Sequence, residues 1–213
     1  MIPFNREQFM AVFAAYNEAV WPAQWLLLAA AVACVVLARV GTLRAGRAAS
    51  AILALLWAWM AVAYHWMQFS DVNPAAYLFA GFCLVAAGLF AWAAVRGTLH
   101  FGLDSRTAPW GLLLVAVALV GYPIASHLLG HRYPETPTFG APCPTTIFTL
   151  GMLLLSASPA PRRILAIPLL WAAVGTVAAF AFSMYEDFSL LFAGLLALLL
   201  QLKDPEKELE SGI

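Results

Sequence analysis

The sequence predicts an all-α membrane protein, in which a bundle of seven transmembrane helices follows an N-terminal amphipathic helix at the membrane interface. Two observations support this fold class. Of the 213 residues, 63% are hydrophobic and 10% are charged, whereas a soluble domain carries about 25% charged residues. The apolar runs are also far longer than the strands of a membrane barrel, and about 20 apolar residues span the hydrocarbon as a helix. The formal net charge of zero indicates no polyanionic partner such as nucleic acid.

Residues 1–20 are predicted to form the interfacial helix, because they are too polar to span a bilayer. Aromatic residues such as Phe9 and Phe13 alternate there with charged residues such as Arg6 and Glu18, a pattern typical of helices that lie in the interface. A single transmembrane domain, 21–202, follows with seven apolar segments: Trp21–Leu37, Ala49–Met67, Pro74–Val95, Pro109–Leu128, Cys143–Ser156, Ile164–Met184 and Phe188–Leu202. The fifth and seventh, of about 15 residues, fall short of a hydrocarbon core of about 30 Å unless flanking residues extend them. A charged cytoplasmic tail is expected at 203–213.

The Lys and Arg residues predict the orientation of these segments. In a seven-segment topology nine of the eleven fall on one side, namely Arg39, Arg44, Arg47, Arg96, Arg106, Arg162, Arg163, Lys203 and Lys207. Only Arg6 and Arg132 fall on the other side. Because short basic loops stay in the cytoplasm, the N-terminus is expected outside and the C-terminus inside. Removing the fifth or the seventh segment would scatter the nine residues, so the charge pattern supports both.

Residues capable of chemistry gather on the predicted outer side. Three of the four histidines and one carboxylate there are of types that bind zinc and other transition metals, and the candidate metal ligands are His65, His127, His131 and Asp71. His127 and His131 would share a helix face if the fourth segment continued past Gly130. Candidate ligand-binding residues on the same side are Asn73, Cys143, Thr145, Glu186 and Asp187.

A purely structural interpretation stands beside this one. Asp71 and the pair Glu186–Asp187 precede predicted helices, where carboxylates cap the positive end of the helix dipole. Asn73, followed by a proline, is typical of a helix start. The proline-rich loop before the fifth segment is expected to be rigid and non-helical as far as Pro144. Cys143 then falls at the N-cap of that helix, where the dipole stabilises a thiolate.

Several motifs resemble an uncharacterised family of bacterial integral membrane proteins, a domain of unknown function. They are Tyr64–Ser70 with Asn73–Tyr77, Pro142–Thr149, Ile167–Trp171 and the pair Glu186–Asp187. The resemblance spans nearly the whole chain and implies a bacterial cytoplasmic (inner) membrane. It implies no activity, so no catalytic residue is assigned from it.

A weaker likeness concerns the seven-helix zinc hydrolases of the alkaline ceramidase type, which hold zinc with three histidines near one membrane face. His65, His127 and His131, with Ser126 and Asp71, supply the residue types. Their order and spacing do not match the motifs of that family. The likeness therefore lies in residue count and topology.

Three functions follow as hypotheses. We favour a non-enzymatic protein whose polar, transition-metal-binding pocket at the outer face serves binding or transport of a small solute, a cation or a lipid. One alternative is an intramembrane zinc-dependent hydrolase, in which three imidazoles hold the metal and activate a water molecule. The other is an accessory subunit of a membrane complex, with a membrane-protein partner or a second copy of the chain. Ionisable groups are nearly absent from the middle of the seven segments, which favours an outer-face site or a docking role over an ion-coupled transporter.

Overall fold

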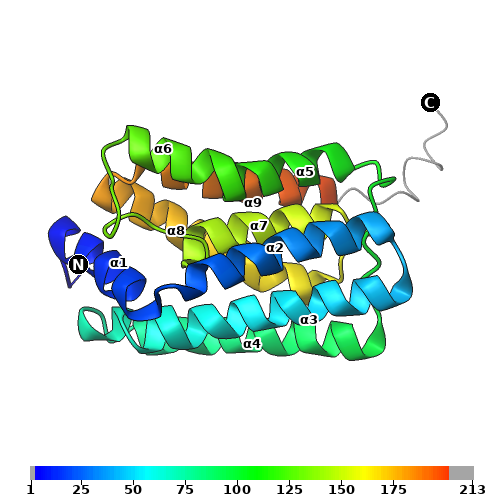
Figure 1. Ribbon diagram of the computed structural model, residues 1–213, viewed down its shortest axis with the longest axis horizontal. Coiled ribbons are helices and arrows are strands. Elements are labelled where there is room, and N and C mark those ends of the chain that lie inside the picture. Colours follow the sequence, from blue (N-terminus) through cyan, green and yellow to red (C-terminus); the bar gives the residue numbers. More distant parts are fainter. Residues whose placement is uncertain (1–2, 202–213) are drawn as a thin grey trace.

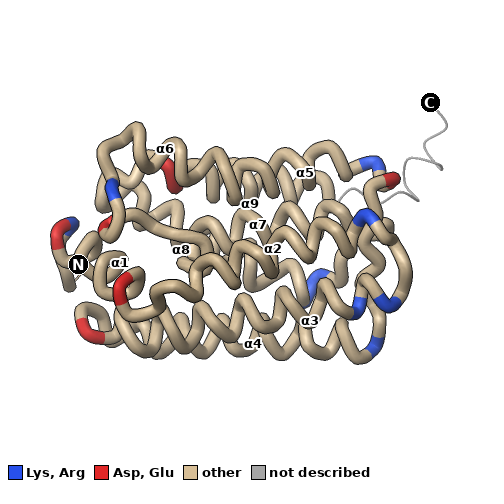
Figure 2. Tube along the Cα trace, in the orientation of Figure 1, with Lys and Arg blue, Asp and Glu red and all other residues tan. Residues whose placement is uncertain are grey.

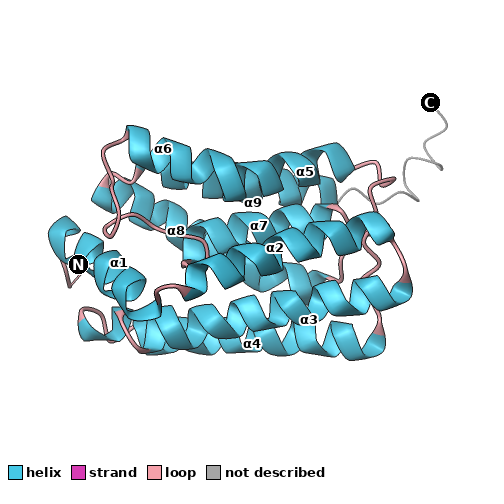
Figure 3. Cartoon of the chain, in the orientation of Figure 1, coloured by secondary structure: helices cyan, strands magenta, loops and turns pink. Residues whose placement is uncertain are grey.

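The computed structural model describes residues 3–201, and every regular element in this range is a helix (Figures 1 and 3). The helices run nearly parallel or antiparallel to one another along the long axis of the molecule. The α-helices are α1 (Arg6–Val20), α2 (Ala23–Val40), α3 (Leu43–Trp59), α4 (Ala76–Arg96), α5 (Ala108–Ala116), α6 (Tyr122–Leu128), α7 (Pro142–Leu154), α8 (Arg162–Phe182) and α9 (Phe188–Gln201). The predicted tail at 203–213 lies outside the described residues.

Two of the long helices contain wider π-helical turns. Helix α3 continues into η1 (Met60–Trp66), and η3 (Val117–Gly121) joins α5 to α6 without a break in the rod. Short 3₁₀ turns, η2 (Phe69–Asp71) and η4 (Tyr185–Asp187), precede α4 and α9. Such π-helical turns are rare and occur frequently at functional sites. Here η1 contributes Tyr64 and His65 to the cavity described below, and Tyr122, which directly follows η3, hydrogen-bonds to Asp187.

Five helical rods are long and apolar enough to cross a membrane, namely α2, α3 with its continuation, α4, α5 through α6, and α8. Each of the other two predicted segments is helical but shorter, α7 having 13 residues and α9 having 14 within the described range. The described chain is therefore a bundle of apolar helices with five clear membrane-span candidates. The count of seven spans stays a prediction.

Helix α7 lies at the centre of the bundle, and all of its residues are buried. It packs against α5, α8 and α9, and it crosses α5 where two glycines meet. A Cβ atom on Gly151 would lie 2.9 Å from the Gly111 carbonyl oxygen, so the two backbones touch. Small residues allow this close approach in membrane bundles. Because its residues are all buried against the rest of the bundle, the short α7 presents no surface to lipid.

The two ends of the bundle differ in charge, as Figure 2 shows. At the basic end the α2–α3, α4–α5 and α7–α8 connections meet, for example where Gly102 N–H donates to the Leu155 carbonyl at 2.8 Å. Most Lys and Arg residues gather there in Figure 2, and most Asp and Glu residues lie at the opposite end. We call that opposite end, formed by α1 and the α3–α4, α6–α7 and α8–α9 connections, the site end.

Helix α1 covers the site end. Asn5 and Gln8 form a reciprocal capping box, with the two hydrogen bonds at 2.9 and 3.0 Å, which fixes where the helix begins. Its apolar face, including Phe9 and Phe13, is buried against the bundle. Near its end, the Tyr16 hydroxyl accepts a hydrogen bond of 2.8 Å from the indole of Trp59. The amphipathic pattern of the N-terminal segment thus serves packing against the protein itself.

Candidate functional site

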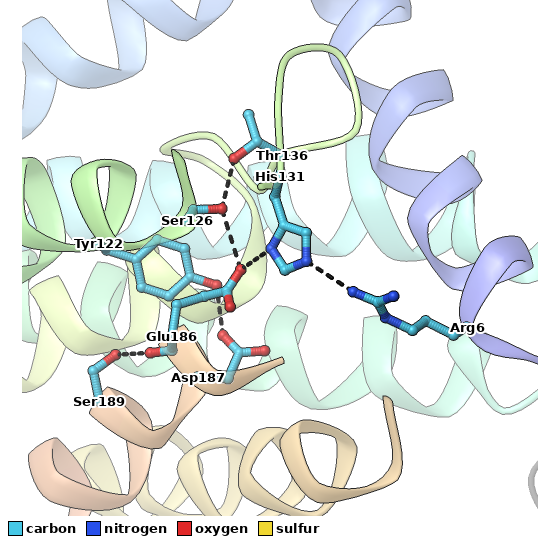
Figure 4. A network of polar contacts seen from close by, with 8 residues as sticks. All are labelled: Arg6, Tyr122, Ser126, His131, Thr136, Glu186, Asp187 and Ser189. Atoms are coloured by element: carbon cyan, nitrogen blue, oxygen red, sulfur yellow. Dashed lines mark hydrogen bonds and ion pairs between the residues drawn. The ribbon is translucent and has the colours of Figure 1, made fainter. Parts of the chain in front are cut away.

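Two adjacent carboxylates, Glu186 and Asp187, form the centre of the site end. Both lie in η4 and are buried, with exposed fractions of 5% and 0%. Burying a charge is costly unless it is paired or hydrogen-bonded, so their partners decide what the site can do. Figure 4 shows that the two side chains engage different partners.

Glu186 accepts hydrogen bonds from two residues of the α6–α7 region. Its Oε1 atom lies 2.6 Å from Nδ1 of His131 and 3.1 Å from Oγ of Ser126. The other ring nitrogen of His131, Nε2, lies 3.0 Å from a guanidinium nitrogen of Arg6. Because a guanidinium only donates, Nε2 must accept, and Nδ1–H donates to the carboxylate. The network therefore holds a neutral imidazole between a cation and an anion and ties α1 to η4.

This arrangement is unlike that of a serine hydrolase. In a catalytic triad the serine hydroxyl bonds to the imidazole that removes its proton. Here the hydroxyl of Ser126 donates to Glu186 and lies 2.8 Å from Oγ1 of Thr136, while both nitrogens of His131 are occupied elsewhere. Ser126 is fully buried. The geometry supports a structural clamp, which consists of Arg6, Ser126, His131 and Glu186. It does not activate Ser126 as a nucleophile.

Only one of the two carboxylate oxygens of Asp187 has a hydrogen-bond partner within the described residues. Oδ1 accepts a hydrogen bond of 2.5 Å from the hydroxyl of Tyr122, whereas Oδ2 has no hydrogen-bond partner among residues 3–201. Burial raises the pKa of Asp187 to about 7, and the hydrogen bond from Tyr122 lowers it in part. In Figure 4 the second carboxylate oxygen points away from Tyr122.

A cavity of about 310 Å³ lies on this side of Asp187, beneath α1 and between η1, α4 and α8. Its volume is at the lower end of the range of roughly 300–1,000 Å³ found for small-molecule sites. One face of α8 lines it from Trp171 to Phe182, a distance of about 16 Å along the helix. The aromatic rings that line it are Phe4, Phe9, Phe13, Tyr64, Phe69, Phe79, Trp171 and Phe182.

Three lining side chains carry buried polar atoms that lack a partner within the described chain. They are Oδ2 of Asp187, both ring nitrogens of His65, and Nε1 of Trp171. The rings of His65 and Trp171 lie edge to face with centroids 4.8 Å apart. Buried polar groups are nearly always hydrogen-bonded in folded proteins, so each such exception requires an explanation. Seven residues in the described range carry such exceptions; these three line one cavity, whereas Gln24, Thr98, Thr146 and Glu186 are not part of its lining.

The ligand-binding candidates divide into two groups. Asn73, Cys143 and Asp187 line the cavity, while Glu186 belongs to the clamp beside it. Thr145 is remote from the cavity lining, and its hydroxyl accepts a hydrogen bond of 3.1 Å from the backbone of Gly140. The prediction that Cys143 is the N-cap of its helix is wrong by two residues: Ala141 takes that position, because Pro142 is already helical. The Asn73 side chain does accept a backbone hydrogen bond, from Ala75 at 3.1 Å.

The four candidate metal ligands do not come together. His65 lies in the cavity wall, His131 lies in the clamp, and His127 and Asp71 are exposed. Helix α6 ends at Leu128, and Gly130 adopts a positive φ of 91°, so the chain turns before His131 and the two histidines separate. Throughout residues 3–201, no three His, Cys, Asp or Glu side chains are grouped so that they could hold a metal ion. The zinc-hydrolase alternative therefore lacks its metal site.

Several residues of the site were missed from the sequence. For Arg6 the available signal was its position, because it is a basic residue on the side opposite to most Lys and Arg residues. Trp171 lay within a recognised motif, and its position on α8 gave no hint of an unpaired N–H group. Tyr122, Phe79 and Phe182 carry no sequence signal, because such residues are ordinary in apolar helices.

A family model described as a family of unknown function, DUF6064, matches residues 6–209. The chain belongs to the DUF6064 family. The resemblance inferred from the motifs is thus confirmed at the level of an uncharacterised family, and membership assigns no activity. The match includes the clamp and all of the cavity lining except Pro3 and Phe4. No curated protein and no solved structure matches the chain.

Proposed function

We propose that this DUF6064 protein is a membrane protein that binds a small organic solute in the aromatic cavity beneath α1. The observation that carries this proposal is the grouping of unpartnered buried polar atoms from Asp187, His65 and Trp171 around one cavity. An unsatisfied buried polar group costs about 1–3 kcal/mol. A ligand that supplies hydrogen-bond partners would offset that cost.

The orientation belongs to the same proposal. We place seven spans in a bacterial inner membrane, with the site end outside and the basic end in the cytoplasm. The gathering of Lys and Arg at one end of the bundle supports this orientation. Single cysteines introduced at Glu135 and at Asp104, in a background in which the three native cysteines are replaced, test it. A membrane-impermeant maleimide should label the first and not the second in intact cells.

A pair of matched probes tests solute binding, because the ligand is unidentified. 2-Phenylethanol and phenethylammonium share one carbon skeleton and differ in their polar group. Both should bind the wild-type protein in lipid nanodiscs, as measured by isothermal titration calorimetry. Ala178→Phe places a ring in the cavity and should abolish binding of both. Ala166→Phe, on the exposed face of the same helix, is the control and should leave binding intact.

Either of two results would refute the proposal. If neither compound binds the wild-type protein, or if Ala178→Phe binds both as well as wild type does, the cavity is not a solute site. Thermal unfolding of each variant establishes that it is folded before binding is compared.

A further inference from the structure

We infer that the solute is an organic ammonium ion with an apolar body, held by Asp187 and the aromatic rings of the cavity. This inference rests on the proposed function and adds the chemical class of the ligand. Three features of the cavity point to it: the single carboxylate, the aromatic walls, and the absence of a cation among the described lining residues.

The carboxylate supplies the first argument. Asp187 is fully buried, and the Tyr122 hydroxyl occupies only Oδ1. The nearby guanidinium of Arg6 hydrogen-bonds to His131, and His131 hydrogen-bonds to Glu186. The positive charge of the clamp is therefore linked to Glu186, the neighbour of Asp187. Asp187 lines the cavity, and its Oδ2 atom has no hydrogen-bond partner among residues 3–201. A primary ammonium offers three N–H donors and the opposite charge, and charge-assisted hydrogen bonds are the strong ones.

The walls supply the second argument. The faces of aromatic rings carry partial negative charge and attract cations within about 6 Å of the ring centre, most strongly where water is excluded. Phe4, which precedes α1, and Phe9 of α1 stack on Phe182 of α8, with centroids 5.1 and 4.7 Å from the Phe182 ring. Phe79 packs edge to face against Trp171 at 5.3 Å. An apolar body fills such a space, and the same rings stabilise the charged end.

The groups that face Asp187 make the site anionic and not cationic. They are Tyr122 from α6, Cys143 from α7, Tyr64 and His65 from η1, and Glu186 beside it in η4. The lining residues from α1, α4 and α8 are not ionisable. A neutral ligand could donate a hydrogen bond to Asp187 but would leave its charge unbalanced, and an anionic ligand would be repelled.

The charge of the probe tests this inference. Phenethylammonium should bind at least tenfold more tightly than 2-phenylethanol at pH 8.5. Asp187→Asn keeps the shape and the acceptor for Tyr122 but removes the charge, and it should weaken phenethylammonium at least tenfold while changing the alcohol less than twofold. Glu135→Gln removes one exposed carboxylate at the same end and is the matched control, with no effect expected on either probe.

The wild-type protein provides a second test that needs no variant. Phenethylammonium stays protonated between pH 5.5 and 8.5, whereas Asp187 ionises within this range because burial raises its pKa to about 7. Affinity for the ammonium should therefore rise more than tenfold across the range, and affinity for the alcohol should stay constant.

The outcomes separate the two proposals. Equal affinity for the two probes, with no effect of Asp187→Asn or of pH, overturns the ammonium inference and leaves the solute site standing. If neither probe binds the wild-type protein, the solute site is overturned as well. A tenfold preference for the ammonium that disappears in Asp187→Asn supports both.

Discussion

The buried carboxyl group of Asp187 predicts how the stability of the protein depends on pH. Its pKa is about 7 in the folded chain, against an ordinary value of 3.8. The folded state thus binds the proton more tightly than the unfolded state does. The resulting contribution to stability is fully present below pH 3.8, declines as the pH rises, and is lost above pH 7.

The size of the effect follows from these two values. The difference between them corresponds to about 4 kcal/mol at about 1.4 kcal/mol per pH unit. Asp187→Asn cannot ionise and keeps an oxygen that accepts from Tyr122. At pH 8 the variant should therefore be more stable than wild type by up to about 4 kcal/mol, or roughly 8–16 °C in Tm for a chain of this length.

Thermal unfolding in detergent micelles, followed by intrinsic tryptophan fluorescence from pH 4 to pH 8.5, measures this difference. Wild type and Asp187→Asn should unfold at nearly the same temperature at pH 4 and diverge as the pH rises. Glu135→Gln, an exposed carboxylate at the same end, should follow wild type throughout. Superimposable curves for wild type and Asp187→Asn between pH 5 and pH 8 would refute the assignment of a buried, half-satisfied carboxyl group.

Three further variants test other parts of the structure by the same unfolding assay. His65→Phe replaces two unpartnered ring nitrogens with carbon and should leave stability unchanged or raise it by about 1–3 kcal/mol, so a large loss would show that His65 has a protein partner. His131→Ala removes a partner from buried Glu186 and should cost about 2–4 kcal/mol, whereas exposed His127→Ala should cost less than about 0.5 kcal/mol. Gly151→Leu forces α5 and α7 apart and should cost several kcal/mol or prevent folding, whereas Gly81→Leu enters open space and should change stability by less than about 1 kcal/mol.

The predicted increase in stability of Asp187→Asn and His65→Phe has a functional meaning. Buried polar groups without partners lower the stability of the empty protein, and sites that bind ligands commonly carry such a cost. Both substitutions are expected to stabilise the fold, and Asp187→Asn is also expected to weaken the ammonium probe. Opposite effects on stability and binding would distinguish a ligand site from an imperfectly packed core.

The sequence predicted the helical bundle because the signal is local. Long apolar runs, the charged residues between them, and the amphipathic pattern of the N-terminal segment each specify their element without reference to distant parts of the chain. Helix α7 was a weak prediction for the same reason. Its 13 residues are too few for a typical span, and its place at the centre of the bundle becomes evident only when its neighbours surround it.

The sequence predicted at which end of the molecule the candidate site residues lie, but not which of them contact one another. The sequence by itself predicted that three of the four histidines, the acid pair and Cys143 lie towards one end, because the order of apolar segments and basic loops sorts residues by end. Only the tertiary structure decided that Gly130 turns His131 away from His127, that Arg6 reaches His131 across 125 residues, and that Asp187 and Trp171 face one cavity. Those relations depend on contacts between residues far apart in the chain, and periodicity and composition carry no record of which distant side chains will meet.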